Sequence, residues 1–200
     1  MRQIILASQS KARAQFFSSL GIVYAAVPAD IDEKNIKDIN FGRRAQTLAN
    51  LKAEKVLKSY PDCIIISCDT YSEYDGRAFE KPKSPAEAKR MLKTLSGQKV
   101  INYTGFRYID KMKNIDFKKT VKVLYEFREL YKKEIEEYVN KYPVTQWAAG
   151  FALVGPYMTS FIANVKGSYT GLSYGLPAEF LIPLLKKSGF EPNPSLGVVQ

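Results

Sequence analysis

One acidic residue follows the most strongly β-forming segment of the sequence and could carry acid–base or metal chemistry. The apolar run Cys63–Cys68 predicts a buried strand, and Asp69 and Thr70 come directly after it, at its expected carboxyl end. In open α/β sheets, ligand sites form outside this end of the strands. The carboxylate of Asp69 could hold Mg²⁺ or accept a proton from water, although a turn aspartate without chemistry fits the local sequence equally well.

A second acidic group lies in the segment Asp30-Ile31-Asp32-Glu33, which the sequence predicts to be a loop. Its carboxylate oxygens could bind a divalent cation, because hard cations prefer oxygen ligands. The alternative is that this loop is ordinary solvated surface.

Hydroxyl and cationic groups gather where the predicted strand Ile4–Ala7 meets a predicted helix. Ser8, Ser10, Lys11 and Arg13 lie there, with Ser10 as the expected first residue of the helix. The free backbone N–H groups of a helix N-terminus favour phosphate. A serine cap with flanking basic residues is also common at helices that bind nothing, so this pattern alone does not decide.

Two further lysines could neutralise phosphate charge. Lys52 falls within a predicted helix, and Lys81 precedes Pro82. Because the chain has 30 Lys and Arg residues, each of these lysines alone is equally compatible with an ordinary surface position.

The sequence has no histidine, which excludes Ser-His-Asp and Cys-His triads and histidine-based metal sites. Chemistry must come from carboxylates, lysines, arginines, hydroxyls or a hard cation held by oxygen. The cysteines, Cys63 and Cys68, are an odd number of residues apart in one strand, so they point to opposite faces and cannot pair.

Composition is that of a globular protein: 200 residues, 46% hydrophobic and 25% charged. We predict a single domain over residues 1–190 and a loose tail over residues 191–200. No apolar run approaches the roughly 20 residues that cross a bilayer, and no export signal is complete, so we expect a cytoplasmic protein without a membrane partner.

The net charge of +10 favours anionic partners such as nucleotides. The basic residues are spread along the chain and are not interleaved with aromatic residues, which argues against a nucleic-acid partner.

Helical and strand patterns alternate along the chain and predict a mixed sheet flanked by helices. The expected order is strand Ile4–Ala7, helix Ser10–Leu20, strand Ile22–Val27, helix Arg43–Leu57, strand Cys63–Cys68, a hairpin around Asp75-Gly76, helix Pro85–Leu95, strands Val100–Ile109 and Thr120–Phe127, helix Leu130–Tyr142, strands Ala148–Val154 and Phe161–Val165, a turn at Gly167–Tyr169, and helix Ala178–Lys187.

Taken together and in this order, the short motifs resemble the Maf family of nucleotide pyrophosphatases over about residues 2–190. The motifs are Leu6-Ala7-Ser8-x-Ser10-x-x-Arg13, Pro28–Glu33, Leu48-Ala49-x-x-Lys52-Ala53, Asp69-Thr70, Lys81-Pro82, Tyr103-Thr104-Gly105 and Gly175-Leu176-Pro177. Each is short, but their number and order make the resemblance specific.

The resemblance implies an elongated α/β fold like that of inosine triphosphate pyrophosphatase, with a central cleft between two lobes. It implies hydrolysis of nucleoside triphosphates, standard or modified, to the monophosphate and pyrophosphate with Mg²⁺ or Mn²⁺, and a homodimer. By the same resemblance, Asp69 is the proton acceptor, and Glu33 and Asp69 hold the metal. The substrate-binding residues implied are Ser8, Ser10, Arg13, Lys52, Thr70 and Lys81.

Two departures from the family pattern fall on positions that bear on specificity. The family usually has Ser-x-Ser-Pro-Arg-Arg in the first loop, where this chain has Lys11 and Ala12 in place of the proline and the first arginine. The family's thymidine and uridine members carry a glutamine where this chain has Val154. Both changes remove polar groups, so we expect a relaxed or altered base preference. The alternative is a catalytically weak or inactive nucleotide-binding regulatory protein.

Overall fold

The computed structural model describes residues 2–33, 36, 40–153 and 156–193 of the chain. Within this part, seven strands form one open mixed sheet in the order β2-β1-β3-β5-β6-β7, with β4 paired to β3. The strands are β1 (Ile4–Leu6), β2 (Ala25–Ala26), β3 (Ile64–Tyr74), β4 (Arg77–Ala78), β5 (Lys99–Asp110), β6 (Ile115–Phe127) and β7 (Ile162–Lys166).

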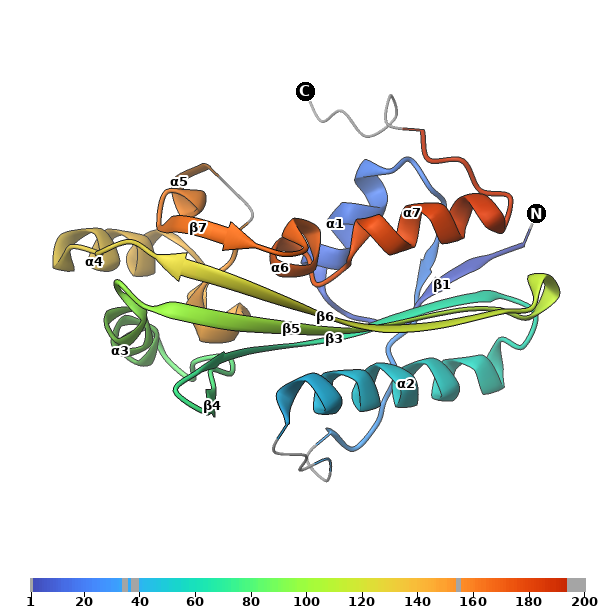
Figure 1. Ribbon diagram of the computed structural model, residues 1–200, viewed down its shortest axis with the longest axis horizontal. Helices are drawn as coiled ribbons and strands as arrows, with labels where there is room; N and C mark the ends of the chain where they lie inside the picture. Colours follow the sequence, from blue (N-terminus) through green and yellow to red (C-terminus); the bar gives the residue numbers. More distant parts are fainter. Residues whose placement is uncertain (1, 34–35, 37–39, 154–155, 194–200) are drawn as a thin grey trace.

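The helices are α1 (Lys11–Ser19), α2 (Phe41–Ser59), α3 (Pro85–Leu95), α4 (Lys132–Lys141), α5 (Pro156–Thr159), α6 (Tyr169–Ser173) and α7 (Ala178–Lys187), with short 3₁₀ helices η2 (Lys111–Lys113), η3 (Val144–Gln146) and η4 (Ala148–Gly150). The long strands β3, β5 and β6 run along the long axis of the molecule (Figure 1). The expected elongated, mixed α/β fold is confirmed.

The sheet changes from parallel to antiparallel pairing at β3. β1 runs parallel to the first residues of β3, and its last residue, Leu6, lies opposite Ile66. β3 continues because β5 pairs with it in antiparallel register as far as Glu73. Asp69 and Thr70 therefore lie within β3, and the prediction that they follow the end of that strand is wrong. They do lie beyond the carboxyl end of the parallel strand β1.

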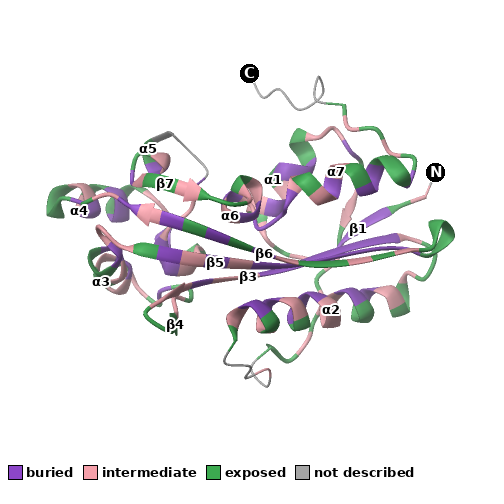
Figure 2. Ribbon diagram, viewed as in Figure 1, coloured by how far each residue is buried: buried purple, intermediate pink, exposed green. Residues whose placement is uncertain are grey.

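Helices cover both faces of this sheet (Figure 1): α2 lies against one face, and α1 and α7 lie against the other. Side chains alternate along β3, so that Ile65 packs in the cluster under α2 whereas Ile64 and Ile66 pack in the cluster with α1 and α7. Figure 2 shows that α2 is buried on its sheet-facing side and exposed on the other. By alternation, Asp69 faces α2 and Thr70 faces α1.

A glycine allows α2 to approach the sheet closely. Gly105 of β5 lies opposite Asp69 in the strand register. A Cβ atom at Gly105 would stand 2.3 Å from the backbone oxygen of Ala45 in α2. Only a residue without a side chain fits here, which explains why a glycine occupies the middle of a buried strand.

We therefore expect Gly105→Ala to lower the free energy of unfolding by about 1–3 kcal/mol, because the α2 backbone would have to move away from the sheet. Urea unfolding measures this change. Gly42→Ala is the matched control, because there the new Cβ would meet only side-chain atoms, of Tyr103 at 3.1 Å and of Asn40 at 3.4 Å. Equal effects of the two substitutions would contradict the close backbone contact.

A separate hydrophobic cluster fills the other end of the sheet, where α3 and α4 pack against β5 and β6. The sequence predicted a strand over Ala148–Val154, which is wrong for the residues described. Residues 148–150 form η4, and Ala149 and Gly150 have φ values of 58° and 67°. Such left-handed backbone cannot continue a strand.

Most other predicted elements are present with small shifts in their ends. Asp75 and Gly76 both have positive φ, as a type I′ hairpin turn requires. The strand expected over Ile22–Val27 is limited to β2, and the turn expected at Gly167–Tyr169 is the N-terminus of α6, capped by Ser168. Both cysteines are unpaired, as expected. No helix in the described ranges is long and apolar enough to cross a membrane.

Candidate active site

Asp69 and the acidic loop meet at one lysine of α2. The Lys52 Nζ atom lies 2.5 Å from the Oδ1 atom of Asp69 and 2.8 Å from the Oε1 atom of Glu33. The side chains of Lys52 and Asp69 are 13% and 12% exposed, whereas that of Glu33 is 50% exposed. The structure thus brings together three of the predicted site residues from three separate segments.

Burial raises the pKa of Asp69 above its ordinary value of 3.8. The positive charges of Lys52 and Arg13 oppose this rise, and the negative charge of Glu33 adds to it. A carboxylate whose pKa is raised toward neutral pH is a better general base than an exposed aspartate. Burial also raises the pKa of the Cys68 thiol to about 12, so the neighbouring cysteine is not a thiolate nucleophile.

The pair Asp69 and Glu33 fits a hard divalent cation. Both carboxylates contact one ammonium group, so they converge on one point, and their oxygens are the ligands that Mg²⁺ prefers. Among the described residues no group of three or more His, Cys, Asp or Glu side chains could hold a metal. In proteins, Mg²⁺ is often held by one or two carboxylates, with water and substrate phosphates as its other ligands.

Arg13 gathers a second set of polar groups around Thr70, on the opposite face of the sheet. Its Nη1 and Nη2 atoms donate to Ser8 Oγ at 3.0 Å and to Thr70 Oγ1 at 3.1 Å, and its Nε atom donates to the Gly175 carbonyl at 3.3 Å. These acceptors are all neutral, and Arg13 is itself buried. A buried guanidinium that contacts neutral acceptors is well suited to an anionic ligand.

Gly175 belongs to this cluster for a steric reason. It has a φ of 63°, and a Cβ atom there would stand 2.8 Å from Thr70 Oγ1 and 3.0 Å from Arg13 Nη2. Thr70 Oγ1 in turn lies 3.3 Å from the Oγ1 atom of Thr104 on β5, which donates to the Gly171 carbonyl at 3.0 Å. The glycine motif therefore fixes Arg13 against the sheet.

The start of α1 adds backbone donors beside Arg13. Ser10 is the N-cap residue, but its side chain makes no capping hydrogen bond, and its N–H group donates to Ser8 Oγ at 3.1 Å. The first N–H groups of α1 have no partner within the helix. Lys11 is exposed and Ala12 is half-buried at this end of the helix.

The edge of β3 beside Asp69 and Thr70 is unpaired among the described strands because β1 is short. The Ile66 carbonyl accepts from the Ala7 N–H group, and the Ser72 carbonyl accepts from the Phe79 N–H group. Between these points no described strand pairs with this edge of β3. Asp69 and Thr70 lie on this unpaired stretch, and Lys52 contacts the one while Arg13 contacts the other.

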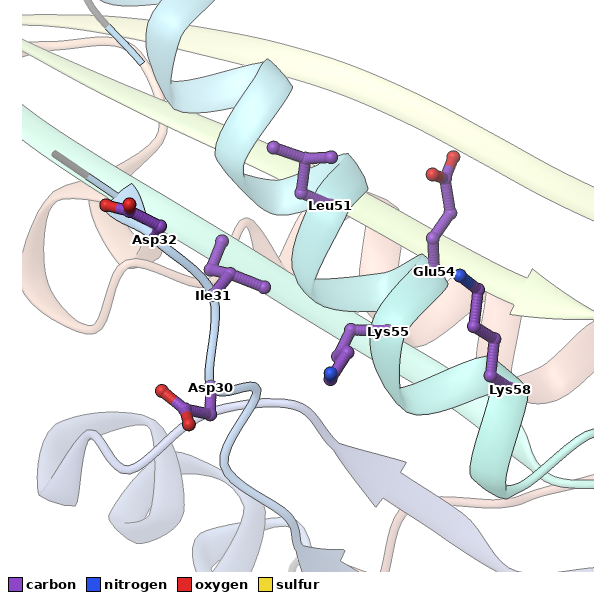
Figure 3. Close-up of a pocket in the computed structure, with 7 residues that line it drawn as sticks. All are labelled: Asp30, Ile31, Asp32, Leu51, Glu54, Lys55 and Lys58. Atoms are coloured by element: carbon purple, nitrogen blue, oxygen red, sulfur yellow. The ribbon is translucent and has the colours of Figure 1, made fainter. Parts of the chain in front are cut away.

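Other predicted positions are not joined to this centre. Lys81 is exposed, and no hydrogen bond or ion pair links it to the other site residues described. Val154 lies outside the described residues. Asp30 and Asp32 line a pocket of about 300 Å³ on the outer side of α2, together with Lys55 and other residues (Figure 3). None of the residues that meet at Lys52 or around Arg13 lines that pocket, which therefore lies outside the candidate active site.

Two residues near the centre were missed in the sequence. Arg44 of α2 places its guanidinium carbon 4.8 Å from the centre of the Tyr71 ring. Tyr71 lies two residues after Asp69 on the same face of β3, and burial raises its pKa to about 12. The sequence does indicate one relation: Arg44 and Lys52 lie eight residues apart, which places them on similar sides of a helix.

Comparison with known proteins gives consistent matches over nearly the whole chain. The family model for Maf-like proteins matches residues 3–188. A dTTP/UTP pyrophosphatase of Syntrophus aciditrophicus is 35% identical over 187 residues, which cover 94% of this chain and 90% of that protein. A nucleoside triphosphate pyrophosphatase of Trichormus variabilis is 30% identical over 189 residues, which cover 94% and 95%. Among solved structures, a HAM1 protein from Coxiella burnetii aligns with a TM-score of 0.49 at 16% identity, over 94% of this chain and 100% of that one.

Proposed function

Because this chain belongs to the Maf family, we propose that it hydrolyses nucleoside triphosphates to nucleoside monophosphate and pyrophosphate, with Asp69 as the general base. The observation that carries this proposal is the contact of Lys52 with both Asp69 and Glu33, beside the Arg13 cluster. One carboxylate with a raised pKa, the buried Arg13 and the partly buried Lys52 are a suitable arrangement for water attack on a polyphosphate.

In the proposed reaction, a water molecule attacks the α-phosphorus. Asp69 takes a proton from this water as the new P–O bond forms. The bond between the α-phosphorus and the bridging oxygen breaks, and the electron pair leaves with pyrophosphate. Asp69 then returns its proton to solvent. The raised pKa of Asp69 supports this role, because burial makes this carboxylate a stronger base than an exposed aspartate.

The cations and hydroxyls bind the polyphosphate. Lys52 and Arg13 neutralise its charge from the two faces of the sheet, and the backbone N–H groups at the start of α1 add neutral donors. Ser8, Ser10, Thr70 and Lys81 complete the proposed substrate-binding set. The charge on the substrate accumulates in the transition state, so preorganised donors accelerate the reaction itself.

Glu33 and Asp69 would hold Mg²⁺ or Mn²⁺. When bound, such a cation supplies charge neutralisation at the phosphate oxygens. Lys52 contacts both of these carboxylates, so its positive charge lies beside the oxygens that would hold the cation. We also propose a single domain over residues 1–190, a homodimer and a cytoplasmic location.

We infer the base preference from the two positions that depart from the family pattern, Ala12 and Val154. Both dTTP/UTP and general nucleoside triphosphate pyrophosphatases are among the relatives, so the family match alone leaves the base open. Ala12 lies half-buried beside the start of α1 and offers no polar side-chain group to a base. We propose relaxed selectivity with hydrolysis retained.

A panel of standard and modified nucleoside triphosphates tests this function. We expect release of pyrophosphate, without orthophosphate, from several bases in the presence of Mg²⁺ or Mn²⁺, and its loss on chelation with EDTA. Pyrophosphate and orthophosphate are assayed separately. Binding of nucleotides without release of either product would overturn the proposal and leave the alternative, a regulatory nucleotide-binding protein.

A further inference from the structure

Arg44 is a cation near the proposed active site that the roles described above do not use. It lies on the first turns of α2, half-buried, with its guanidinium over the face of the Tyr71 ring. Its Nε atom is shielded from solvent and has no hydrogen-bond partner in the described part of the chain. No ion pair to Arg44 is recorded there either, whereas Lys52 on the same helix has two.

The geometry brings Arg44 and Lys52 toward the same place. Side chains of a helix lean toward its N-terminus, so Lys52 reaches back along α2 to Asp69. Arg44 lies nearer that N-terminus and rests on Tyr71, two residues beyond Asp69 on the same face of β3. The charges of Asp69, Arg44, Glu33 and Glu80 all act on the pKa of the Tyr71 hydroxyl. These charged groups therefore surround one region of the α2 face.

Lys52 alone cannot neutralise a polyphosphate in this region, because its ammonium group already contacts two carboxylates. Arg44 supplies a positive charge on the same face, with no carboxylate partner among the described residues. Stacking on Tyr71 orients the planar guanidinium and reduces the entropy lost when it binds a ligand. Such a group binds phosphate oxygens well.

We propose that Arg44 is a substrate-binding residue that contacts a phosphate oxygen of the nucleotide, and that the Tyr71 ring holds it in position. This inference rests on the proposed function, because it names a further contact of the same site. Tyr71 acts only through Arg44 and is a positioning residue. Arg44 contributes to binding of the polyphosphate and not to recognition of the base.

Inorganic tripolyphosphate, which has no base or sugar, is the probe. We expect Arg44→Gln to weaken tripolyphosphate binding about 10- to 100-fold in titration calorimetry, the loss of one charge-assisted contact. The KM for a nucleoside triphosphate should rise by a similar factor, with little change in kcat. Arg44→Lys keeps the charge but loses the planar stacking, so it should recover only part of the affinity.

Arg43→Gln is the matched control, because Arg43 is the exposed neighbour on α2 and its loss changes the net charge equally. Tyr71→Leu should weaken tripolyphosphate binding, whereas Tyr71→Phe keeps the ring and should not. Unchanged tripolyphosphate affinity in folded Arg44→Gln would overturn the proposal, and so would an equal loss in Arg43→Gln. If the wild-type protein hydrolysed no nucleotide, the proposed function would fail, but the calorimetry would still decide the role of Arg44.

Discussion

Asp69→Asn should abolish pyrophosphate release while leaving the protein folded. The amide keeps the shape of the side chain and can still accept a hydrogen bond from Lys52, but it cannot take a proton from water. Loss of a general base lowers turnover by about 10²- to 10⁴-fold. The expected fall in kcat is at the upper end of this range if Asp69 also holds the metal, since one substitution then removes two functions.

Asp75→Asn is the matched control for this substitution. Asp75 lies six residues further along the chain, is exposed, and adopts a left-handed conformation that asparagine also tolerates. Turnover should be unchanged in this variant. Retention of more than about a tenth of wild-type kcat in Asp69→Asn would remove Asp69 from the chemical step, because a positioned base contributes at least about 10²-fold.

The same variant should be more stable than the wild type at neutral pH. Burial raises the pKa of Asp69 in the folded protein, so the folded state favours the protonated form more than the unfolded chain does. Asp69 therefore adds to the stability of the fold at pH values below 3.8, its pKa in the unfolded chain. This contribution is lost as the pH rises through the higher pKa of the folded state. Calorimetric melts of both proteins should show a Tm difference that narrows as the pH falls. A lower Tm for Asp69→Asn at neutral pH would mean that attraction to Lys52 outweighs burial.

The sequence predicts this fold well where the hydrophobic pattern and the backbone geometry agree. Ser84 and Pro85 mark the start of α3, and the helix expected over Ala178–Lys187 has those bounds in the structure. The sequence prediction fails where strand pairing continues although the side chains change from apolar to polar. The apolar run ends at Cys68, but β5 pairs with β3 past that point and keeps Asp69 in the strand. Periodicity along one strand cannot reveal how long its partner is.

The sequence predicts which residues form the candidate site but not how they are arranged. Nothing in the sequence indicates that Asp69 and Thr70 point to opposite faces, or that Lys52 joins Asp69 to Glu33 on one of them. That arrangement follows from strand alternation together with the early end of β1. Arg44 was not predicted because, in a chain with 30 Lys and Arg residues, its spacing from Lys52 along one helix is too common to single it out. The contact of its guanidinium with the Tyr71 ring distinguishes Arg44 from the other arginine of the helix.

Lys52→Met is the substitution with the second largest expected effect, because Lys52 has two roles in the proposed mechanism. Methionine keeps an unbranched apolar stem packed against the sheet and removes only the ammonium group. We expect kcat to fall about 10²- to 10³-fold, as when one preorganised donor to a transition state is lost. Lys55→Met is the control: Lys55 lies on the same helix, is exposed, and lines the pocket outside the active site.

The pH dependence separates the two roles of Lys52. Its charge and hydrogen bond lower the pKa of Asp69 against the effect of burial, and the Glu33 charge raises it. Removing the ammonium should therefore move the acid limb of the kcat/KM profile to higher pH, because catalysis requires ionised Asp69. If Lys52 only binds phosphate, its loss would lower the rate at every pH and leave this limb in place. A profile of unchanged shape in Lys52→Met would thus restrict Lys52 to substrate binding, whereas a shifted limb would show that the 2.5 Å contact with Asp69 sets the protonation of the base.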